Sequence, residues 1–450
     1  MELVGERSGA RRGARATVVV VAIAAALFLA GGVGLFRGSG SSEPAATSVV
    51  GPGVLAGPVV GSGSLSSLIA RLQERVREEP GDWRSLASLG AAYVQQARIT
   101  ADPGYYPKAQ GVLSESLRIR EAGNFEAYVG RGSLEAARHD FAGALRDGER
   151  AARINPYNGD VYGVIGDAQV ELGRYRQAFA TFQTMVDTKP NVGSYARVSY
   201  ARELQGDVPG AVEAMKQALQ AAGTSADAAW ASYQLAELAF NDGEVGRAAG
   251  YYHRALKLDP AYVPPLAGLA KVAWARGRAD EAIEGYERVT SVYPAPEYVI
   301  ALGDLYRSVG RTRLAKQQAD LVRAEEQLFE ANGVNVDLEM SLYDADHGDA
   351  AAALTAAREE WDRRHSIHVA DALAWSLYAS GEYREAQTYS REALRLGTRN
   401  ALFFFHAGMI QLKLGDRAEA RSLLSTAVDI NPHFSIRWSE IARETLDELG

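Results

Sequence analysis

Residues 159–192, GDVYGVIGDAQVELGRYRQAFATFQTMVDTKPNV, have the pattern of two short helices joined by a tight turn. The small residues Gly166 and Ala178 let the two helices approach closely, and Phe182 fills the space beside them. Gly173 lies between the helices and can take the left-handed conformation that ends a first helix. The stretch therefore predicts a closely packed helix–turn–helix hairpin.

The same pattern returns along the chain with a period of 34 residues. Pro156 and Pro190 are 34 residues apart, as are Gly381 and Gly415, and a proline at such a position cannot continue the second helix. A period of this length with these residue types resembles the tetratricopeptide repeat, a helix–turn–helix unit. Extending the pattern predicts about ten units, which begin near residues 86, 125, 159, 192, 229, 263, 296, 334, 367 and 401.

The resemblance implies an all-α fold, a right-handed α-solenoid of about ten such units over residues 65–450. Several strings look like a family of bacterial membrane-anchored multi-repeat proteins that has no assigned activity. They are ANGVNVDLEMSLYDADHGD, DALAWSLY, REALRLGT, FFHAGMI and NPHF. This second resemblance therefore informs the fold more than the function.

Two units depart from the pattern. An insertion at Ile99–Tyr106 contains Asp102-Pro103-Gly104 and predicts a longer loop in the first unit. The seventh unit predicts an extended second helix that ends before Asn332-Gly333. Segments 65–79 and 434–449 are amphipathic and predict helices that cap the two ends, because terminal repeats otherwise expose their apolar faces.

The N-terminal region predicts a membrane anchor. Residues 16–36 are 21 uncharged, mostly apolar residues, which is enough to cross a bilayer as a helix. Four arginines precede this run, so the positive-inside bias predicts that residues 1–15 stay in the cytoplasm. The solenoid is then extracytoplasmic, on a protein that crosses the cell membrane once.

A cleaved signal peptide is the alternative, and it would give a secreted protein. The apolar run is longer than a secretory core of roughly 7–15 residues, which favours a retained helix. Residues 37–64 are mainly Gly, Ser, Pro, Ala and Val, and they predict a flexible linker between the anchor and the solenoid.

Composition excludes several kinds of site and partner. The chain has no cysteine, which excludes disulfides, thiolate metal sites and a cysteine nucleophile. Five arginines against two glutamates give residues 1–37 a charge of +3, so the total of −8 leaves −11 for the rest. A domain this acidic repels phosphate, and we expect no nucleic-acid partner.

In this repeat the first helix of each unit lines the concave face of the solenoid. The positions opposite the core stripe predict a groove that carries large aromatic and acidic side chains. Such a groove suits an apolar and basic peptide, and it lacks the paired lysines and asparagines that clamp a C-terminal carboxylate. The candidate groove residues are Tyr200, Trp230, Tyr233, Glu237, Phe240, Lys271, Trp274, Asp304, Arg307, Asp371, Trp375 and Tyr378.

Two strings are candidates for metal chemistry. Residues 344–349, DADHGD, resemble part of a calcium loop, but the glycine is in the fifth place and the twelfth is threonine. His365 and His368 lack a visible third ligand for zinc. No phosphate loop, dinucleotide fingerprint or nucleophile elbow occurs, so the sequence predicts neither an enzyme nor a cofactor.

These features together predict a membrane-tethered scaffold that binds other proteins or peptides in its concave groove. A second hypothesis is an assembly or maturation factor that holds unfolded apocytochrome, because residues 68–93 look like openings of such repeat domains. A third is a metal-binding or sensor protein that uses the turn at residues 344–349.

Overall fold

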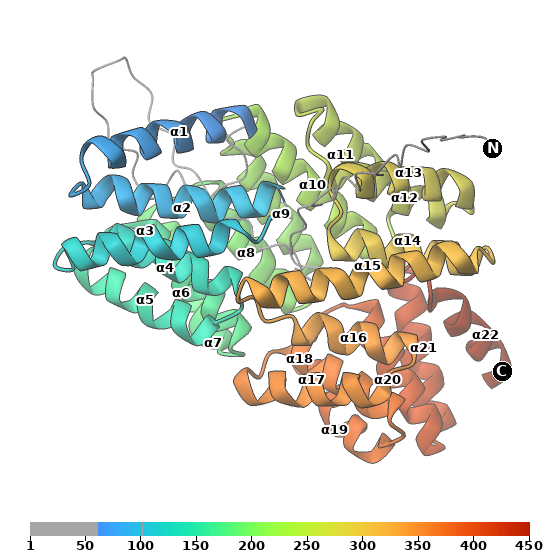
Figure 1. Ribbon diagram of the computed structural model, residues 1–450. Helices are drawn as coiled ribbons and strands as arrows, with labels where there is room; N and C mark the ends of the chain where they lie inside the picture. Colours follow the sequence, from blue (N-terminus) through green and yellow to red (C-terminus); the bar gives the residue numbers. More distant parts are fainter. Residues whose placement is uncertain (1–61, 101) are drawn as a thin grey trace, which may run out of the picture.

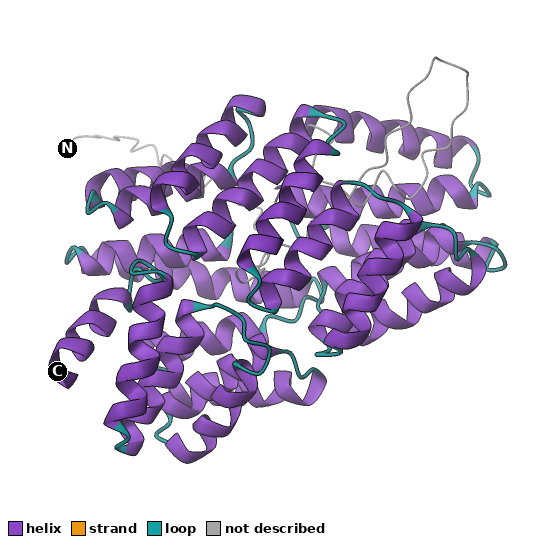
Figure 2. Ribbon diagram, turned by 180° about the vertical axis from the view of Figure 1, so that it is seen from behind, coloured by secondary structure: helices purple, strands orange, loops and turns teal. Residues whose placement is uncertain are grey.

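The computed structural model describes residues 62–100 and 102–450, and this part of the chain consists of 22 helices joined by loops (Figures 1 and 2). A first helix, α1 (Ser62–Glu78), precedes ten helix pairs, and α22 (Ser439–Leu449) follows them. The pairs are α2 (Trp83–Thr100) with α3 (Tyr105–Ile119), α4 (Phe125–Ala137) with α5 (Phe141–Ile154), α6 (Gly159–Glu171) with α7 (Tyr175–Thr188), α8 (Val192–Leu204) with α9 (Val208–Gln220), α10 (Ser225–Asn241) with α11 (Val245–Leu258), α12 (Pro264–Ala275) with α13 (Ala279–Val292), α14 (Pro296–Ser308) with α15 (Thr312–Ala331), α16 (Asp337–His347) with α17 (Ala350–Arg363), α18 (Ile367–Ala379) with α19 (Tyr383–Ala393), and α20 (Ala401–Leu414) with α21 (Arg417–Ile430).

These ten pairs are the predicted units, here numbered one to ten. The first helices of units two, three, four, seven, nine and ten begin at the predicted residue, and the other four begin within four residues of it. The predicted anchor at residues 16–36 lies outside the described residues, as does most of the predicted linker. Among the described helices, none combines the length and apolar character needed to cross a bilayer.

The hairpin at residues 159–192 has the predicted packing. A Cβ atom added to Gly166 would lie 2.3 Å from the ring of Phe182, so only glycine allows this approach of α6 and α7. Gly173 has a φ of +73° in the turn between them, as predicted. After Pro190, Asn191 and Ser194 form a capping box that starts α8.

Of the two departures from the pattern, one is confirmed and one is wrong in extent. The second helix of unit seven, α15, is extended and ends at Ala331, as predicted. The insertion in unit one contains a shorter loop than predicted, because α2 continues to Thr100 and α3 begins at Tyr105. The Tyr293 hydroxyl donates a 3.1 Å hydrogen bond to the Arg98 carbonyl, so a contact from a distant unit stabilises the extra turn of α2.

The units stack into a superhelix. First helices of neighbouring units pack on one another, for example α2 on α4, α4 on α6 and α16 on α18. A second helix packs on the first helix of its own unit and on that of the next, as α5 packs on α4 and α6. Each unit is rotated slightly relative to the last, and the stack curves. In Figure 1 the later units (orange and red) lie beneath the earlier ones (blue to green), and α15 runs between them.

The curvature brings the chain back onto itself along a seam. We define the seam as the contacts between units one to five and the turns that follow units six to ten. Six of its hydrogen bonds join residues 191 to 196 positions apart, so one superhelical turn takes roughly 5.7 repeats of 34 residues. The bonded pairs are Tyr293 with Arg98, His139 with Asn335, Arg364 with Glu171, Ile367 with Tyr175, Thr398 with Leu204, and Asn431 with Phe240.

The seam has an apolar interior as well. Val322 and Phe329 of α15 belong to one buried cluster with Leu68 of α1 and Leu113 of α3. A second cluster contains residues of α6 to α8 together with residues of α18 to α20. The two superhelical turns therefore share core, and the contact between them is more than a set of surface hydrogen bonds.

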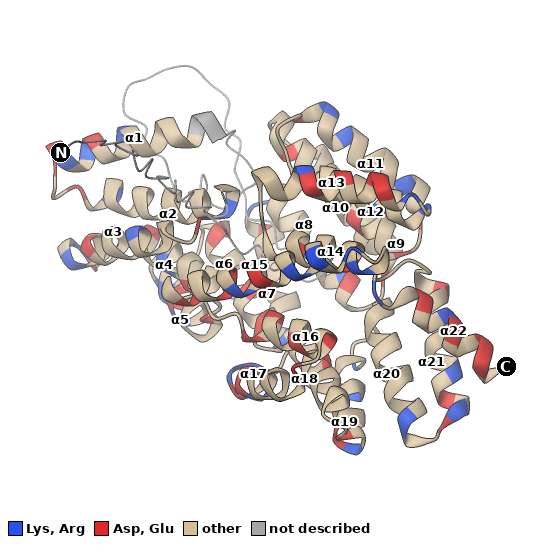
Figure 3. Ribbon diagram, turned by 45° about the vertical axis from the view of Figure 1, so that its right-hand side comes forward, with Lys and Arg blue, Asp and Glu red and all other residues tan. Residues whose placement is uncertain are grey.

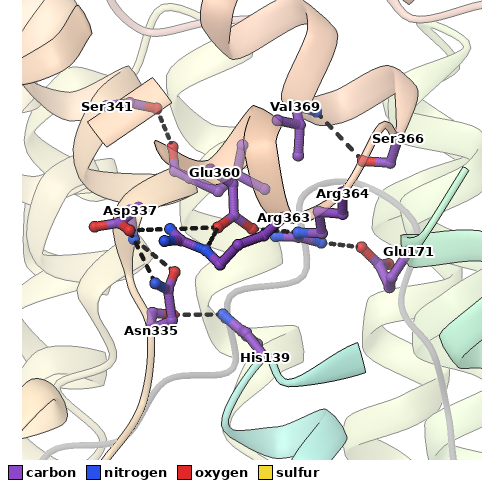
Figure 4. A network of polar contacts seen from close by, with 11 residues as sticks. His139, Glu171, Asn335, Asp337, Ser341, Glu360, Arg363, Arg364, Ser366 and Val369 are labelled. Carbon is purple, nitrogen blue, oxygen red and sulfur yellow. Dashed lines mark hydrogen bonds and ion pairs between the residues drawn. The ribbon is translucent and has the colours of Figure 1, made fainter. Parts of the chain in front are cut away.

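Buried charges lie in the middle of the seam (Figure 4). Arg364 is 4% exposed and its guanidinium donates to Glu171 of unit three and to Glu360 of α17. Burial alone would raise the pKa of Glu360, but Arg364 and Arg363 outweigh it and lower that pKa. In the neighbouring seam contact, His139 Nδ1 lies 2.6 Å from the Asn335 carbonyl oxygen.

Glu325 is a buried acid on the same face of α15 as Val322 and Phe329. Neither of its carboxyl oxygens has a hydrogen-bond partner in the described part of the chain. Burial and the nearby charge of Glu297 raise the pKa of Glu325 to about 9. In the unfolded chain this carboxyl ionises near pH 4.5, so its contribution to stability falls as the pH rises from 4.5 towards 9.

We expect Glu325→Met to stabilise the protein by about 1–3 kcal/mol at pH 8, and by less at pH 5, because methionine does not titrate. Urea unfolding at the two pH values measures the difference. The control is Glu213→Met on α9, where the acid is exposed and the variant should differ from the parent equally at both values. An equal effect of Glu325→Met at pH 5 and pH 8 would contradict the assignment.

Candidate functional site

The twelve candidate groove residues all lie on first helices, and the structure divides them into two groups. One group follows α8, α10 and α12 in the middle of the chain. It contains Tyr200, Trp230, Tyr233, Glu237, Phe240, Lys271 and Trp274. The other group lies on α14 and α18, and it contains Asp304, Arg307, Asp371, Trp375 and Tyr378.

Their exposure differs from that of an open groove. Five of the twelve are buried, six are partly exposed and only Arg307 is exposed. The buried ones are Tyr200, Trp230, Phe240, Asp371 and Trp375. The first helices are packed on several sides; in α18 every residue from 367 to 377 is buried. Whether any of the twelve contacts a partner stays a prediction, and the partly exposed ones are the available surface.

Glu237 organises the first group. It accepts a hydrogen bond from the Tyr252 hydroxyl and a 2.8 Å bond from Lys271 Nζ. The same lysine lies 4.4 Å from the centre of the Phe240 ring. Burial and the charge of Glu237 raise the pKa of Glu203, on the first helix of the preceding unit, to about 8. Glu237, the acid of this group, is thus paired within the protein, with one lysine and one tyrosine.

Trp375 organises the second group. Its ring stacks on His406 at 4.1 Å and on Tyr378 at 4.5 Å between centroids. His406 Nδ1 lies 3.0 Å from Asp371, so this buried pair fixes the imidazole against the indole. The Trp375 indole N–H donates a 2.7 Å bond to Asp346 Oδ1 of α16. The result is a rigid aromatic cluster in which Trp375 and His406 are buried. Its partly exposed edge, formed by Tyr378 and the Asp346 carboxylate, is here called the surface around Trp375.

A residue near the C-terminus completes this surface, and the sequence analysis did not find it. Trp438 donates from its indole N–H to the same Asp346 oxygen, at 3.1 Å. Its ring lies 5.5 Å from both Trp375 and Phe405. The sequence analysis predicted only a capping segment at 434–449. The signal that could have identified Trp438 is its close spacing with Phe434, just before the last helix.

The turn at residues 344–349 has structural roles for its carboxylates. Asp344 pairs with Arg323, Asp346 accepts from the two indoles, and Asp349 accepts from Ala352 N at the start of α17. Gly348 has a φ of +100° and ends α16. Within residues 62–100 and 102–450, no group of three His, Asp or Glu side chains is arranged to hold a metal ion.

The two histidines at residues 365 and 368 are also far from a metal-site geometry. His365 packs against the Trp361 ring at 4.4 Å, and His368 packs against Phe403 at 5.4 Å. Burial and the nearby Arg364 lower the pKa of His368 to about 4, so its imidazole is neutral at physiological pH. We therefore interpret these side chains as parts of the packing between units eight, nine and ten.

Comparison with protein families tests the interpretation of the repeats. Tetratricopeptide-repeat family models match residues 164–226, 195–263, 239–305 and 372–433. This chain is a multi-TPR protein. The matched residues cover units three to six, most of α14 in unit seven, and units nine and ten.

Solved structures with similar folds are also found. The APC/C hetero-tetramer Cut9-Hcn1 is 13% identical over 86% of this chain and 87% of that one, with a TM-score of 0.38. The human IFIT1 dimer with PPP-AAAA is 13% identical over 81% and 86%, with a TM-score of 0.44. The MamA protein is 19% identical over 37% and 90%, with a TM-score of 0.29. No curated protein matches the sequence.

Proposed function

We propose that this TPR protein is a membrane-tethered scaffold that binds protein or peptide partners and catalyses no reaction. TPR units serve protein–protein interaction, and this supports the binding of protein partners. The observation that carries the proposal is the aromatic and acidic surface around Trp375, which unites residues of α14, α16, α18 and α20. Rigid aromatic side chains beside carboxylates suit an apolar and basic segment of a partner.

The distribution of charge supports attraction of a partner's basic segment at one place on the solenoid rather than over its whole surface. Acidic and basic positions are interspersed on outer helices such as α19 and α21 (Figure 3). Around Trp375, in contrast, Asp304 and Asp346 are partly exposed acids, whereas Asp371 is buried against His406. Asp304 is also partnered, by Arg307 and His347. A partner's cation would therefore add to a site that already orders its carboxylates.

The scaffold is tested by crosslinking the full-length chain in its native cells and identifying the captured proteins. We expect Arg307→Ser/Tyr378→Ala to reduce the capture of at least one partner by tenfold or more, because anchoring aromatic and arginine side chains contribute most of the energy in interfaces. The matched control is Tyr157→Ala, which removes a tyrosine that is 88% exposed in the turn after α5. Equal capture by both variants would contradict this site.

The tether is tested separately by fractionating cells that express the full chain or a chain lacking residues 16–36. We expect the full chain to sediment with membranes and resist extraction by carbonate, whereas the shortened chain is soluble. If the full chain is already soluble, the membrane tether is contradicted and the scaffold function is not.

A further inference from the structure

Residues 433–438, HFSIRW, form an exit segment between α21 and α22. Covering the last repeat requires only a helix against unit ten, and α22 packs on α21 in that way. The exit segment reaches much further. It touches first helices of units six, eight, nine and ten, together with the apolar cluster of α12 to α14.

The anchors of the segment contact several first helices, and two of them share Phe405. His433 meets the Trp274 ring edge-on at 6.1 Å, and Phe434 lies 5.5 Å from Phe405. Ile436 packs against the cluster of α12 to α14. Trp438 stacks on Phe405 and meets Trp375 edge-on while its indole N–H bonds to Asp346. A short stretch of chain thus crosses the whole surface around Trp375.

Local hydrogen bonds give the segment a defined shape. The Asn431 side chain accepts from the His433 amide at 2.8 Å. Ser435 Oγ accepts from the amides of Arg437 and Trp438, both at 3.2 Å. These turns present Phe434, Ile436 and Trp438 to the surface, in the manner of a bound peptide with three apolar anchors.

The segment carries a cation beside its tryptophan. The Arg437 guanidinium lies 4.8 Å from the centre of the Trp438 ring, and its Nε has no hydrogen-bond partner in the described part of the chain. The charge of Arg437 also acts on the Asp346 carboxylate. The surface therefore accepts an indole N–H directly and an adjacent guanidinium through electrostatics.

The segment lies on the surface rather than within it. Trp375 and Phe405, which receive it, are 3% and 0% exposed. The side chains from residue 432 to residue 438 are all partly exposed. A buried aromatic floor covered by a partly exposed segment has the geometry of a site with its occupant.

We propose that the exit segment is an intramolecular ligand of the concave surface, and that the protein's partners bind there by presenting an aromatic–basic segment of the same chemistry. The proposal rests on the proposed scaffold function and names the chemistry of the partner. It places Asp346, Trp375 and Phe405 in the binding site, with Trp438 and Arg437 as the groups that a partner displaces.

The probe is a fluorescein-labelled peptide with the sequence NPHFSIRWS, titrated into full-length protein in detergent. We expect Phe434→Ala/Trp438→Ala to bind it at least tenfold more tightly than the parent, because the attached segment competes at an effective concentration of millimolar order. Arg437→Glu should act in the same direction, since a glutamate opposite Asp346 repels the segment without removing an aromatic anchor. The control, Tyr157→Ala/Val309→Ala, changes two exposed apolar residues elsewhere and should bind like the parent.

Adding Asp346→Ala to the Arg437→Glu variant should weaken the peptide again by tenfold or more, which locates it on this surface. The proposal is overturned if both opened variants, folded by circular dichroism, bind the peptide within twofold of the parent, or if Asp346→Ala has no effect. Captured partners that bind Arg437→Glu and the parent equally would also overturn it while leaving the scaffold intact. If the peptide binds as expected but no partner is captured in cells, the scaffold function is contradicted and the intramolecular ligand is not.

Discussion

Arg364→Ala should lower the free energy of unfolding by about 3–5 kcal/mol, the largest effect that we expect of any single charge in the protein. The guanidinium lies between Glu171 and Glu360 in the seam, and all three side chains are buried. Removing it leaves two carboxylates without their shared cation in a medium that solvates them poorly. Chemical denaturation followed by far-UV circular dichroism measures the loss.

Two further variants serve as controls: one removes an exposed arginine elsewhere, and the other removes the buried charges together. Arg358→Ala removes a half-exposed arginine that pairs with Glu382 at 3.4 Å, and it should cost less than about 1 kcal/mol. Arg364→Met/Glu171→Gln/Glu360→Gln removes the charges together and should recover much of the stability. A loss in Arg364→Ala no larger than that in Arg358→Ala would show that the buried cation contributes little.

Gly173→Ala should destabilise the protein by about 1–3 kcal/mol more than the same change at Gly277. Both glycines lie in the internal turn of a unit, with φ of +73° and +74°, so both variants carry the backbone strain of about 1–2 kcal/mol. Only Gly173 faces the seam, where an added Cβ would lie 2.2 Å from the His365 carbonyl oxygen. At Gly277 nothing lies within 4 Å of that position.

The difference between the two variants therefore isolates the seam. We also expect the Ile367 amide, which donates to the Tyr175 hydroxyl at 2.7 Å, to exchange its hydrogen faster in Gly173→Ala and at the parental rate in Gly277→Ala. Denaturation midpoints and hydrogen exchange monitored by mass spectrometry give the two readings. Identical behaviour of the two alanine variants would mean that the superhelical turns separate easily.

The repeats and their boundaries follow from local signals in the sequence. Gly166 with Phe182, Gly173 and Pro190 each act within one hairpin, and such contacts repeat with the period of the chain. The extended α15 could also be predicted, because its helical pattern continues to Asn332-Gly333. Asp102-Pro103-Gly104 signals a turn, and the structure has one there, but the predicted loop was too long because α2 continues to Thr100, next to the seam contact at Arg98.

The seam and the exit segment could not be predicted in this way. Which turns meet depends on the small rotation from each unit to the next, summed over about 5.7 repeats, and no single repeat encodes that sum. The groove prediction placed its residues on first helices, where the structure has them, but it did not predict their exposure, because a stripe assigned from one hairpin omits the neighbours that bury Trp230 and Trp375. Trp438 was missed since its partners Asp346 and Phe405 lie in other units.

The seam also has a consequence for the making of this protein. The turn in unit three that carries Gly173 meets its partner only when residues near 365 have been synthesised. In the six hydrogen-bonded pairs of the seam, the second residue is made 191 to 196 residues after the first. At roughly 5–20 residues per second, each early unit waits about 10–40 seconds with one edge uncovered. Those edges include apolar groups from Leu68 to Leu204, so the first half of the chain should depend on a chaperone until the second half emerges.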